Sequence, residues 1–405
     1  MTKPTLRLYQ LEAVKDILDK KRVLIADEMG LGKCAETIAA KTAIEKRYND
    51  DVKTLVVCPA SVAEHWVDEI KLWYKKHEDT RIARIRTSTY EDDIKHAKSA
   101  DFTIIGYPTL SYYGNRQEKI SLLKTLDFRY GILDEAHNAK NPDSIRSMAI
   151  KKIFDSFDYL AILSGTPIPN SVIDIYMLLS LLDKDSFPIN VESSRAILGS
   201  FYSLFRRDPE FVRRVLNDRM LRRTVDDYLH AKFPNLKRSD LEVTLTDEHG
   251  DTYVQVYEND DIKPAAKLMQ LLKVSIDPNL VNPNLIKENL ASKIGRLESC
   301  VYRSLDKCVQ DVIDNNGKAL IFSNLKRGVT DKLQRRYAKY GALVIDGDVS
   351  SVNDQEGGVR EEIRRKFQKD KDYKILIATT VMDEGVDLTA ATDVFHLSLP
   401  YAPAA

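Results

Sequence analysis

The feature that most constrains the fold is a series of short apolar runs, rich in β-branched residues, that alternates with longer amphipathic stretches. The runs show little alternation between apolar and polar residues, which is typical of strands buried on both faces. Helical patterns follow several of the runs. Alternation of this kind predicts an α/β fold with a parallel sheet wrapped by helices. In the first 185 residues the expected strands are 22–26, 54–58, 102–106, 130–134 and 159–164, and expected helices include 33–47, 62–75 and 171–182.

The alternation stops near residue 186 and resumes in the second half of the chain. Further strands are expected at 318–322, 342–346, 374–378 and 393–397. A length of 405 residues is itself natural for two domains. We therefore predict three parts, which are a first lobe over 1–185, a helical, basic insertion and linker over 186–240, and a second lobe over 241–405.

Charge and composition exclude several classes of protein. The 61 Lys and Arg residues balance 61 Asp and Glu residues, so any contact with nucleic acid must be local. No apolar run approaches the roughly 18–20 residues of a membrane span, and the N-terminus lacks the apolar core of a signal peptide. The four cysteines form no common metal-binding pattern. We therefore expect an intracellular protein with no membrane partner.

The strongest chemical signal is the sequence ADEMGLGKC at 26–34, between an expected strand and an expected helix. Gly30 and Gly32 let the backbone approach an anion closely, and the helix N-terminus offers unpaired N–H groups. Lys33 would add a positive charge for the β- and γ-phosphates of ATP. A glycine turn that merely starts a helix is the alternative, but the order of strand, loop, lysine and helix favours phosphate binding.

Two residues of this loop depart from the common P-loop formula. Asp27 stands where the first glycine would be, and Cys34 replaces the Ser or Thr whose hydroxyl usually touches Mg²⁺. A thiol is a soft, poor ligand for a hard cation, so magnesium binding is expected to be weakened or to rely more on carboxylates and water. The predicted nucleotide-binding segment comprises Asp27, Glu28, Met29, Gly30, Leu31, Gly32, Lys33 and Cys34.

The carboxylates are expected in the sequence ILDEAH at 132–137, at the end of an apolar strand. A strand of this kind delivers Asp134 and Glu135 to the edge of the sheet where ligands bind in open α/β folds. Asp134 would hold Mg²⁺, and Glu135 would orient or deprotonate the attacking water. An acidic pair at a strand end is more often a solvated edge or a helix cap. The catalytic interpretation is favoured here only because a P-loop is expected in the same sheet.

Together with further motifs, these segments resemble a Swi/Snf-related, remodeller-like ATPase of helicase superfamily two. The resemblance covers nearly the whole chain, and the joint order and spacing of the motifs make it specific. The matching segments are 6–14 (Q motif), 27–33 (motif I), 55–73 (Ia), 134–144 (II), 163–182 (III), 219–229 with 233–236 (linker), 271–280, 318–324 (IV), 344–350 (IVa) and 375–394 (V).

The resemblance implies two RecA-like lobes that close on ATP and Mg²⁺ and couple hydrolysis to movement along double-stranded DNA. It implies that Gln10 contacts the adenine base, and that Gly385 and Asp387 approach the nucleotide from the second lobe. It also implies residues that couple the hydrolysis site to DNA, which are His137, Ser164 and Thr166. Short polar side chains suit contacts with a DNA backbone, and those expected there are Ser61, Tyr107, Ser323, Asn324 and Thr379. For these polar positions a helix-cap or turn role is the alternative.

Aromatic and basic residues add two weaker signals. Trp66 and Trp73 are seven residues apart and share one face of an expected helix, where packing is the expected role. Residues 206–238 hold ten basic and five acidic side chains, although arginine-rich helices are commonly just solvated faces. Because Arg222 and Arg223 lie in the segment that resembles the linker, an interlobe or DNA role is favoured.

Two alternatives to a double-stranded DNA translocase that remodels protein–DNA complexes stay open. Motif V reads MDEGVDL, which leans toward strand-separating helicases that act on DNA or RNA. Cys34 and the end of the chain at 399–405, before the expected arginines of motif VI, favour instead an ATP- or DNA-binding clamp without turnover. We expect a second lobe that is incomplete at its C-terminus, in a fragment or trimmed chain. Duplex DNA is the expected nucleic-acid partner in preference to RNA, DNA-bound proteins are further expected partners, and the core is expected to be monomeric. Because the chain begins shortly before the first matching segment, we expect a cytoplasmic protein of bacterial, archaeal or viral source, or a nuclear one if eukaryotic.

Overall fold

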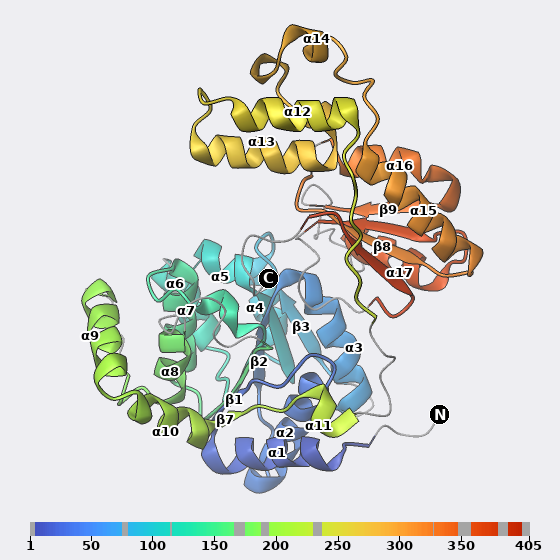
Figure 1. Cartoon of the computed structure of the whole chain (residues 1–405). Helices are drawn as coiled ribbons and strands as arrows, with labels where there is room; N and C mark the ends of the chain where they lie inside the picture. The colour runs from blue at the N-terminus through green and yellow to red at the C-terminus, as the bar shows by residue number, and fades with distance from the viewer. Residues whose placement is uncertain are drawn as a thin grey trace. The chain divides into compact units, whose positions relative to one another are not determined.

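The chain forms two compact units, the first ending at Pro234 and the second beginning at Asn235. The computed structural model describes residues 5–74, 80–113, 116–165, 175–187, 194–229, 237–326, 328–346, 358–379 and 388–398. Each unit contains its own parallel sheet with helices around it (Figure 1). The predicted α/β class is therefore confirmed.

Seven parallel strands form the sheet of the first unit, in the order β3-β4-β2-β5-β6-β1-β7. The five strands expected in this part of the chain are confirmed to within one residue. The sequence missed β3, an edge strand whose residues alternate between partly and fully buried, and β7, which is only two residues long. The strands are β1 (Arg22–Ile25), β2 (Thr54–Cys58), β3 (Ile82–Ile85), β4 (Phe102–Gly106), β5 (Tyr130–Leu133), β6 (Tyr159–Leu163) and β7 (Met220–Leu221).

Helices cover both faces of this sheet because successive strand residues point to opposite sides. Leu24 packs into a core with the helices α4–α8, whereas Val23 and Ile25 pack into a second core with α1–α3. The helices of the unit are α1 (Leu8–Lys20), α2 (Lys33–Tyr48), α3 (Ala63–Trp73), α4 (Tyr90–Ala97), α5 (Tyr107–Tyr113), α6 (Gln117–Lys124), α7 (Ile145–Phe154), α8 (Tyr176–Leu182), α9 (Ser194–Arg207), α10 (Pro209–Arg219) and α11 (Val225–Leu229), with 3₁₀ turns at Ala60–Val62 and Ala136–Ala139.

The strand order brings the chemical motifs to one edge of the sheet. Strand β6 lies between β1 and β5, and all three run parallel. The residues that follow their carboxyl ends, Asp27, Asp134 and Ser164, are therefore delivered to the same edge. Ligands bind at this edge in open α/β sheets.

The second unit contains a four-stranded parallel sheet in the order β11-β8-β10-β9. All four expected strands are confirmed to within one residue. Helices α12 and α13 lie side by side (Figure 1) and share a small apolar core. In the part of the chain that the structure describes, no helix has the length and apolarity that crossing a membrane requires.

The elements of this unit have the following bounds. The strands are β8 (Ala319–Phe322), β9 (Ala342–Ile345), β10 (Ile375–Ala378) and β11 (Asp393–His396). The helices are α12 (Asp247–Glu258), α13 (Pro264–Ile276), α14 (Glu288–Ala291), α15 (Cys300–Asp314), α16 (Thr330–Arg336) and α17 (Gly358–Lys369), with 3₁₀ turns at Pro278–Leu280, Pro283–Leu285 and Ala338–Tyr340.

Candidate nucleotide-binding site

The loop between β1 and α2 has a backbone that requires glycine. Gly30 and Gly32 adopt φ angles of 87° and 88°, in the left-handed region that L side chains rarely enter. A Cβ atom on Gly32 would also lie 2.5 Å from Nε2 of Gln10. The glycines thus let the loop turn tightly into the N-terminus of α2, where free N–H groups favour an anion.

Lys33 lies over this loop. Its Nζ atom donates to the carbonyl of Asp27 at 2.8 Å and lies 3.4 Å from the carbonyl oxygen of Glu28. Both partners are neutral backbone groups at the start of the loop. Phosphate oxygens, which carry charge, would compete well for the same ammonium group.

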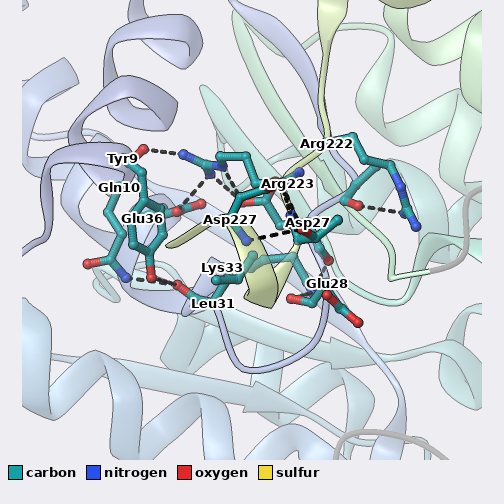
Figure 2. A network of polar contacts seen from close by, with 12 residues as sticks. Tyr9, Gln10, Asp27, Glu28, Leu31, Lys33, Glu36, Arg222, Arg223 and Asp227 are labelled. Carbon is teal, nitrogen blue, oxygen red and sulfur yellow. Dashed lines mark hydrogen bonds and ion pairs between the residues drawn. The ribbon is translucent and has the colours of Figure 1, made fainter. Parts of the chain in front are cut away.

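Helix α1 is fastened to the loop through Leu31. The Tyr9 hydroxyl donates to the Leu31 carbonyl at 2.9 Å, and Nε2 of Gln10 donates to it at 3.0 Å (Figure 2). The other amide atom of Gln10, Oε1, accepts from the Arg7 N–H at 2.8 Å. The structure thus places Gln10 against the loop, and its contact with adenine remains a prediction.

Asp27 has a structural partner that explains its departure from the P-loop formula. It is completely buried, and its two oxygens accept from the backbone N–H of Arg223 at 3.0 Å and from Nε at 2.8 Å. The same guanidinium donates to Glu36 Oε1 at 2.9 Å (Figure 2). Burial raises the pKa of Glu36 to about 8, and the Arg223 charge opposes this rise. Asp27 is therefore an ion-pair partner inside the lobe.

The carboxylate of Asp134 is held on both oxygens. Oδ2 accepts from the indole Nε1 of Trp66 at 2.8 Å, and Oδ1 accepts from the N–H of Glu135 at 2.9 Å. Burial and the neighbouring Glu135 charge raise the pKa of Asp134 to about 6, while Trp66 and Lys33 oppose the rise. An oriented, charged carboxylate at neutral pH is a hard oxygen donor and fits Mg²⁺.

Glu135 and His137 come together beside this carboxylate. Glu135 is nearly buried and has φ 45° and ψ 55°, a left-handed conformation that is costly for a residue with a side chain. Its Oε2 atom lies 3.4 Å from Nδ1 of His137. Strained residues of this kind cluster at functional sites.

Cys34 suits a magnesium ion less well than Asp134 does. Burial, followed by the Asp134 charge, raises the pKa of the Cys34 thiol well above its ordinary range. A thiol that stays protonated is a poor ligand for magnesium. Among the described residues there is no group of three or more His, Cys, Asp and Glu that could hold a metal ion. A magnesium ion at Asp134 would accordingly complete its shell with phosphate oxygens and water, as this ion commonly does.

The remaining predicted site residues differ in exposure. Met29 and Ser61 are exposed, Asn324 is partly buried, and Ser164, Ser323 and Thr379 are buried. Tyr107 is also buried, and its hydroxyl donates to the Asp134 carbonyl at 2.6 Å. Burial favours internal roles for the hydroxyl groups of Tyr107, Ser323 and Thr379 over direct DNA contact. DNA contact stays a prediction for the five residues expected there, and the coupling role of Ser164 stays a prediction as well. Thr166, Gly385 and Asp387 lie outside the described residues.

Sequence reasoning missed the hydrogen bond made by Trp66. The packing role expected for this residue is confirmed, because its side chain is completely buried in the core under α3. Its N–H group also orients Asp134, which is 68 positions away in the chain. The heptad spacing of Trp66 and Trp73 could not reveal this partner.

A glycine-rich loop beside strand-end carboxylates defines the core of an α/β nucleotide-binding protein. Residues 9–289 match the family described as SNF2-related domain, and residues 301–405 match the helicase conserved C-terminal domain. The chain belongs to the SNF2-related family, which confirms the resemblance seen in the sequence.

Similar proteins come from distant organisms. Protein CHROMATIN REMODELING 19 of Arabidopsis thaliana is 26% identical over 68% of this chain and 37% of its own length. The human DNA annealing helicase and endonuclease ZRANB3 is 23% identical over 94% of this chain and 34% of its own length. An uncharacterized ATP-dependent helicase of Mycoplasma pneumoniae is 26% identical over 98% of this chain and 37% of its own length. The chain thus spans little more than a third of the length of these relatives.

A solved structure is similar over nearly the whole chain. It is the Sulfolobus solfataricus SWI2/SNF2 ATPase core in complex with dsDNA, with 22% identity and a TM-score of 0.48. The match covers 98% of this chain and 82% of that structure.

Proposed function

We propose that this chain is the core of a DNA-dependent ATPase that couples ATP hydrolysis to movement on duplex DNA and to remodelling of protein–DNA complexes. The observation that carries the proposal is the arrangement of Lys33 and the Asp134–Glu135 pair. They follow β1 and β5 at one edge of a parallel sheet, in a chain of the SNF2-related family.

The proposed roles follow from the chemistry of each group. The loop N–H groups and Lys33 bind the phosphates. Asp134 holds Mg²⁺ through a carboxylate that Trp66 and Glu135 orient. Magnesium, when bound, neutralises charge on the phosphoryl group. Glu135 orients the attacking water and accepts its proton, and His137 lies beside it to couple this step to DNA.

Duplex DNA is the proposed partner. Two relatives of this chain are named for chromatin remodelling and for DNA annealing. The exposed Ser61, in the 3₁₀ turn at Ala60–Val62, is the best-placed described candidate for a DNA phosphate contact.

We further propose that Gly385 and Asp387 complete the nucleotide site, that the core is a monomer, and that it works in the cytoplasm, or in the nucleus if the source is eukaryotic.

ATP turnover by the full-length protein tests the proposal. It should be measured without nucleic acid and with duplex DNA, single-stranded DNA or RNA, for the native protein and for Lys33→Ala. We expect duplex DNA to stimulate turnover most, with a response that weakens as salt rises because the contacts are to phosphates. Lys33→Ala should abolish turnover while circular dichroism stays unchanged.

Other outcomes of this experiment point elsewhere. Stimulation by single strands or RNA alone would favour the strand-separating helicase that motif V suggests. Turnover that no nucleic acid changes would remove DNA dependence, and turnover retained by Lys33→Ala would remove the phosphate-binding role of the loop.

A further inference from the structure

A segment far along the chain returns to the phosphate-binding loop. Strand β7 pairs with β1, so that Leu221 lies beside Ile25. The pairing continues into the loop, where the Glu28 N–H donates to the Arg223 carbonyl at 3.0 Å. The side chain of Glu28 then accepts from the Val225 N–H at 2.7 Å. Residues 220–225 therefore run along the start of the loop as part of the same lobe.

Arg223 is the most buried residue of this segment. Its side chain is only 6% exposed. The guanidinium binds Asp27 through Nε and Nη2, binds Glu36 through Nη2, and donates from Nη1 to the Tyr9 carbonyl (Figure 2). It also lies 5.0 Å from the centre of the Tyr9 ring.

The three partners of Arg223 belong to three different parts of the nucleotide site. Asp27 begins the loop, and Glu36 lies in the first turn of α2, beyond the loop. Tyr9 lies on α1, and its hydroxyl also donates to the Leu31 carbonyl within the loop. The planar guanidinium of Arg223, with its several fixed donors, thus joins both ends of the loop to helix α1. Only arginine offers this fork of donors, since the lysine ammonium is a single point charge.

We infer that Arg223 is a positioning residue for nucleotide binding, which holds the two ends of the phosphate-binding loop and helix α1 in the geometry that accepts the phosphates. The inference rests on the proposed binding of ATP at this loop. Arg223 touches neither phosphates nor reacting atoms in this role, and acts through Asp27, Glu36 and Tyr9.

A buried ion pair that serves stability alone is the competing explanation, and the same helix offers a control for it. Lys41 is completely buried in α2, binds Glu45, and donates to the Tyr74 hydroxyl at 3.1 Å. Glu45 lies nine positions beyond Glu36, away from the loop. Lys41→Met therefore breaks a buried ion pair in α2 without touching the contacts of Arg223.

The test compares Arg223→Lys with Lys41→Met and the native protein. A fluorescent ATP analogue measures nucleotide affinity, and hydrogen exchange without nucleotide measures the mobility of the amides of residues 27–33. Thermal unfolding measures stability for each variant. We expect Arg223→Lys to bind the analogue about tenfold more weakly, as the loss of one or two charge-assisted bonds implies, and to exchange the loop amides faster. Lys41→Met should lower the melting temperature but leave both site measurements at native values.

Each outcome decides for or against the inference. Native affinity and native loop exchange in Arg223→Lys would overturn it. An equal loss of affinity in Lys41→Met would overturn it as well, because affinity would then follow stability. Failure of the native protein to bind the analogue would count against the proposed function instead, and loop exchange would still report on Arg223.

Discussion

At the scale of a single residue, Cys34 bears on the magnesium chemistry proposed for the site. It occupies the position where the P-loop formula has a hydroxyl, and it packs partly buried against the apolar core that contains Cys58 and Trp66. Its thiol pKa is raised by this burial and by Asp134. The apolar surroundings therefore accept the thiol, and the proposed magnesium ion would rely on the oriented carboxylate of Asp134.

Replacing Cys34 with threonine should strengthen the use of magnesium. A hydroxyl is a harder donor than a thiol, so we expect the magnesium concentration for half-maximal ATP turnover to fall several-fold. A magnesium titration of turnover measures this change. Cys308→Thr, at a partly exposed site in α15, is the matched control and should leave the titration unchanged. Superimposable curves for Cys34→Thr and the native protein would show that this position does not affect the ion.

At the scale of elements, a buried histidine joins three helices of the second unit. His249 on α12 donates from Nε2 to the Val274 carbonyl of α13 at 2.5 Å. Its Nδ1 atom accepts from the N–H of Cys300, at the start of α15, at 3.4 Å. This pattern needs the neutral imidazole with its proton on Nε2. Burial lowers the pKa of His249 below its ordinary value, which agrees with a neutral ring.

The stability of these helices should depend on pH. Because the folded pKa of His249 lies below the unfolded value near 6.5, its contribution is present above about pH 6.5 and is lost as pH falls through the folded pKa. We expect hydrogen exchange in α12, α13 and α15 to accelerate as the pH falls from 7.5 to 5.5, after correction for intrinsic rates. The free energy of opening should fall by at most about 1.4 kcal/mol per pH unit. His249→Gln should flatten this dependence, and His96→Gln, at an exposed position on α4, should not. An unchanged slope in His249→Gln would refute the assignment.

At the scale of the whole molecule, each unit carries apolar cores of its own. The cores of the first unit pack on both faces of the seven-stranded sheet, and those of the second pack around the four-stranded sheet. A change inside one core should therefore act first on the unit that contains it.

Gly131→Ala is expected to destabilise the first unit alone. A Cβ atom at this position in β5 would lie 2.3 Å from the Phe154 ring and 2.8 Å from the Phe157 ring, both part of the core. Overpacking of this kind costs about 1–3 kcal/mol. Calorimetry should show a lower melting transition for the first unit and an unchanged one for the second. Gly199→Ala, where an added Cβ meets nothing within 4 Å, is the control; equal effects of the two substitutions would contradict the crowding argument.

Much of the fold followed from local pattern, and the misses have physical causes. Continuous apolar runs identified the central strands to within a residue, because strands buried on both faces leave a strong signal. Strand β3 lies at the sheet edge and β7 has two residues, so neither produces such a run. At the site, the loop over 27–33 was recognisable because glycine, lysine and helix start are neighbours in sequence.

The sequence alone determined the class of fold, the order of the motifs and the family, since these depend on local periodicity and on residues close together in the chain. Because the net charge is zero, the sequence also indicated that any contact with nucleic acid must be local. Only the tertiary structure showed that Trp66 orients Asp134 and that Arg223 ties Asp27 to Glu36. Arg223 and Asp27 are 196 positions apart. Contacts at such separation arise from the way sheet and helices pack, and no local pattern of residues encodes which two side chains that packing will bring together.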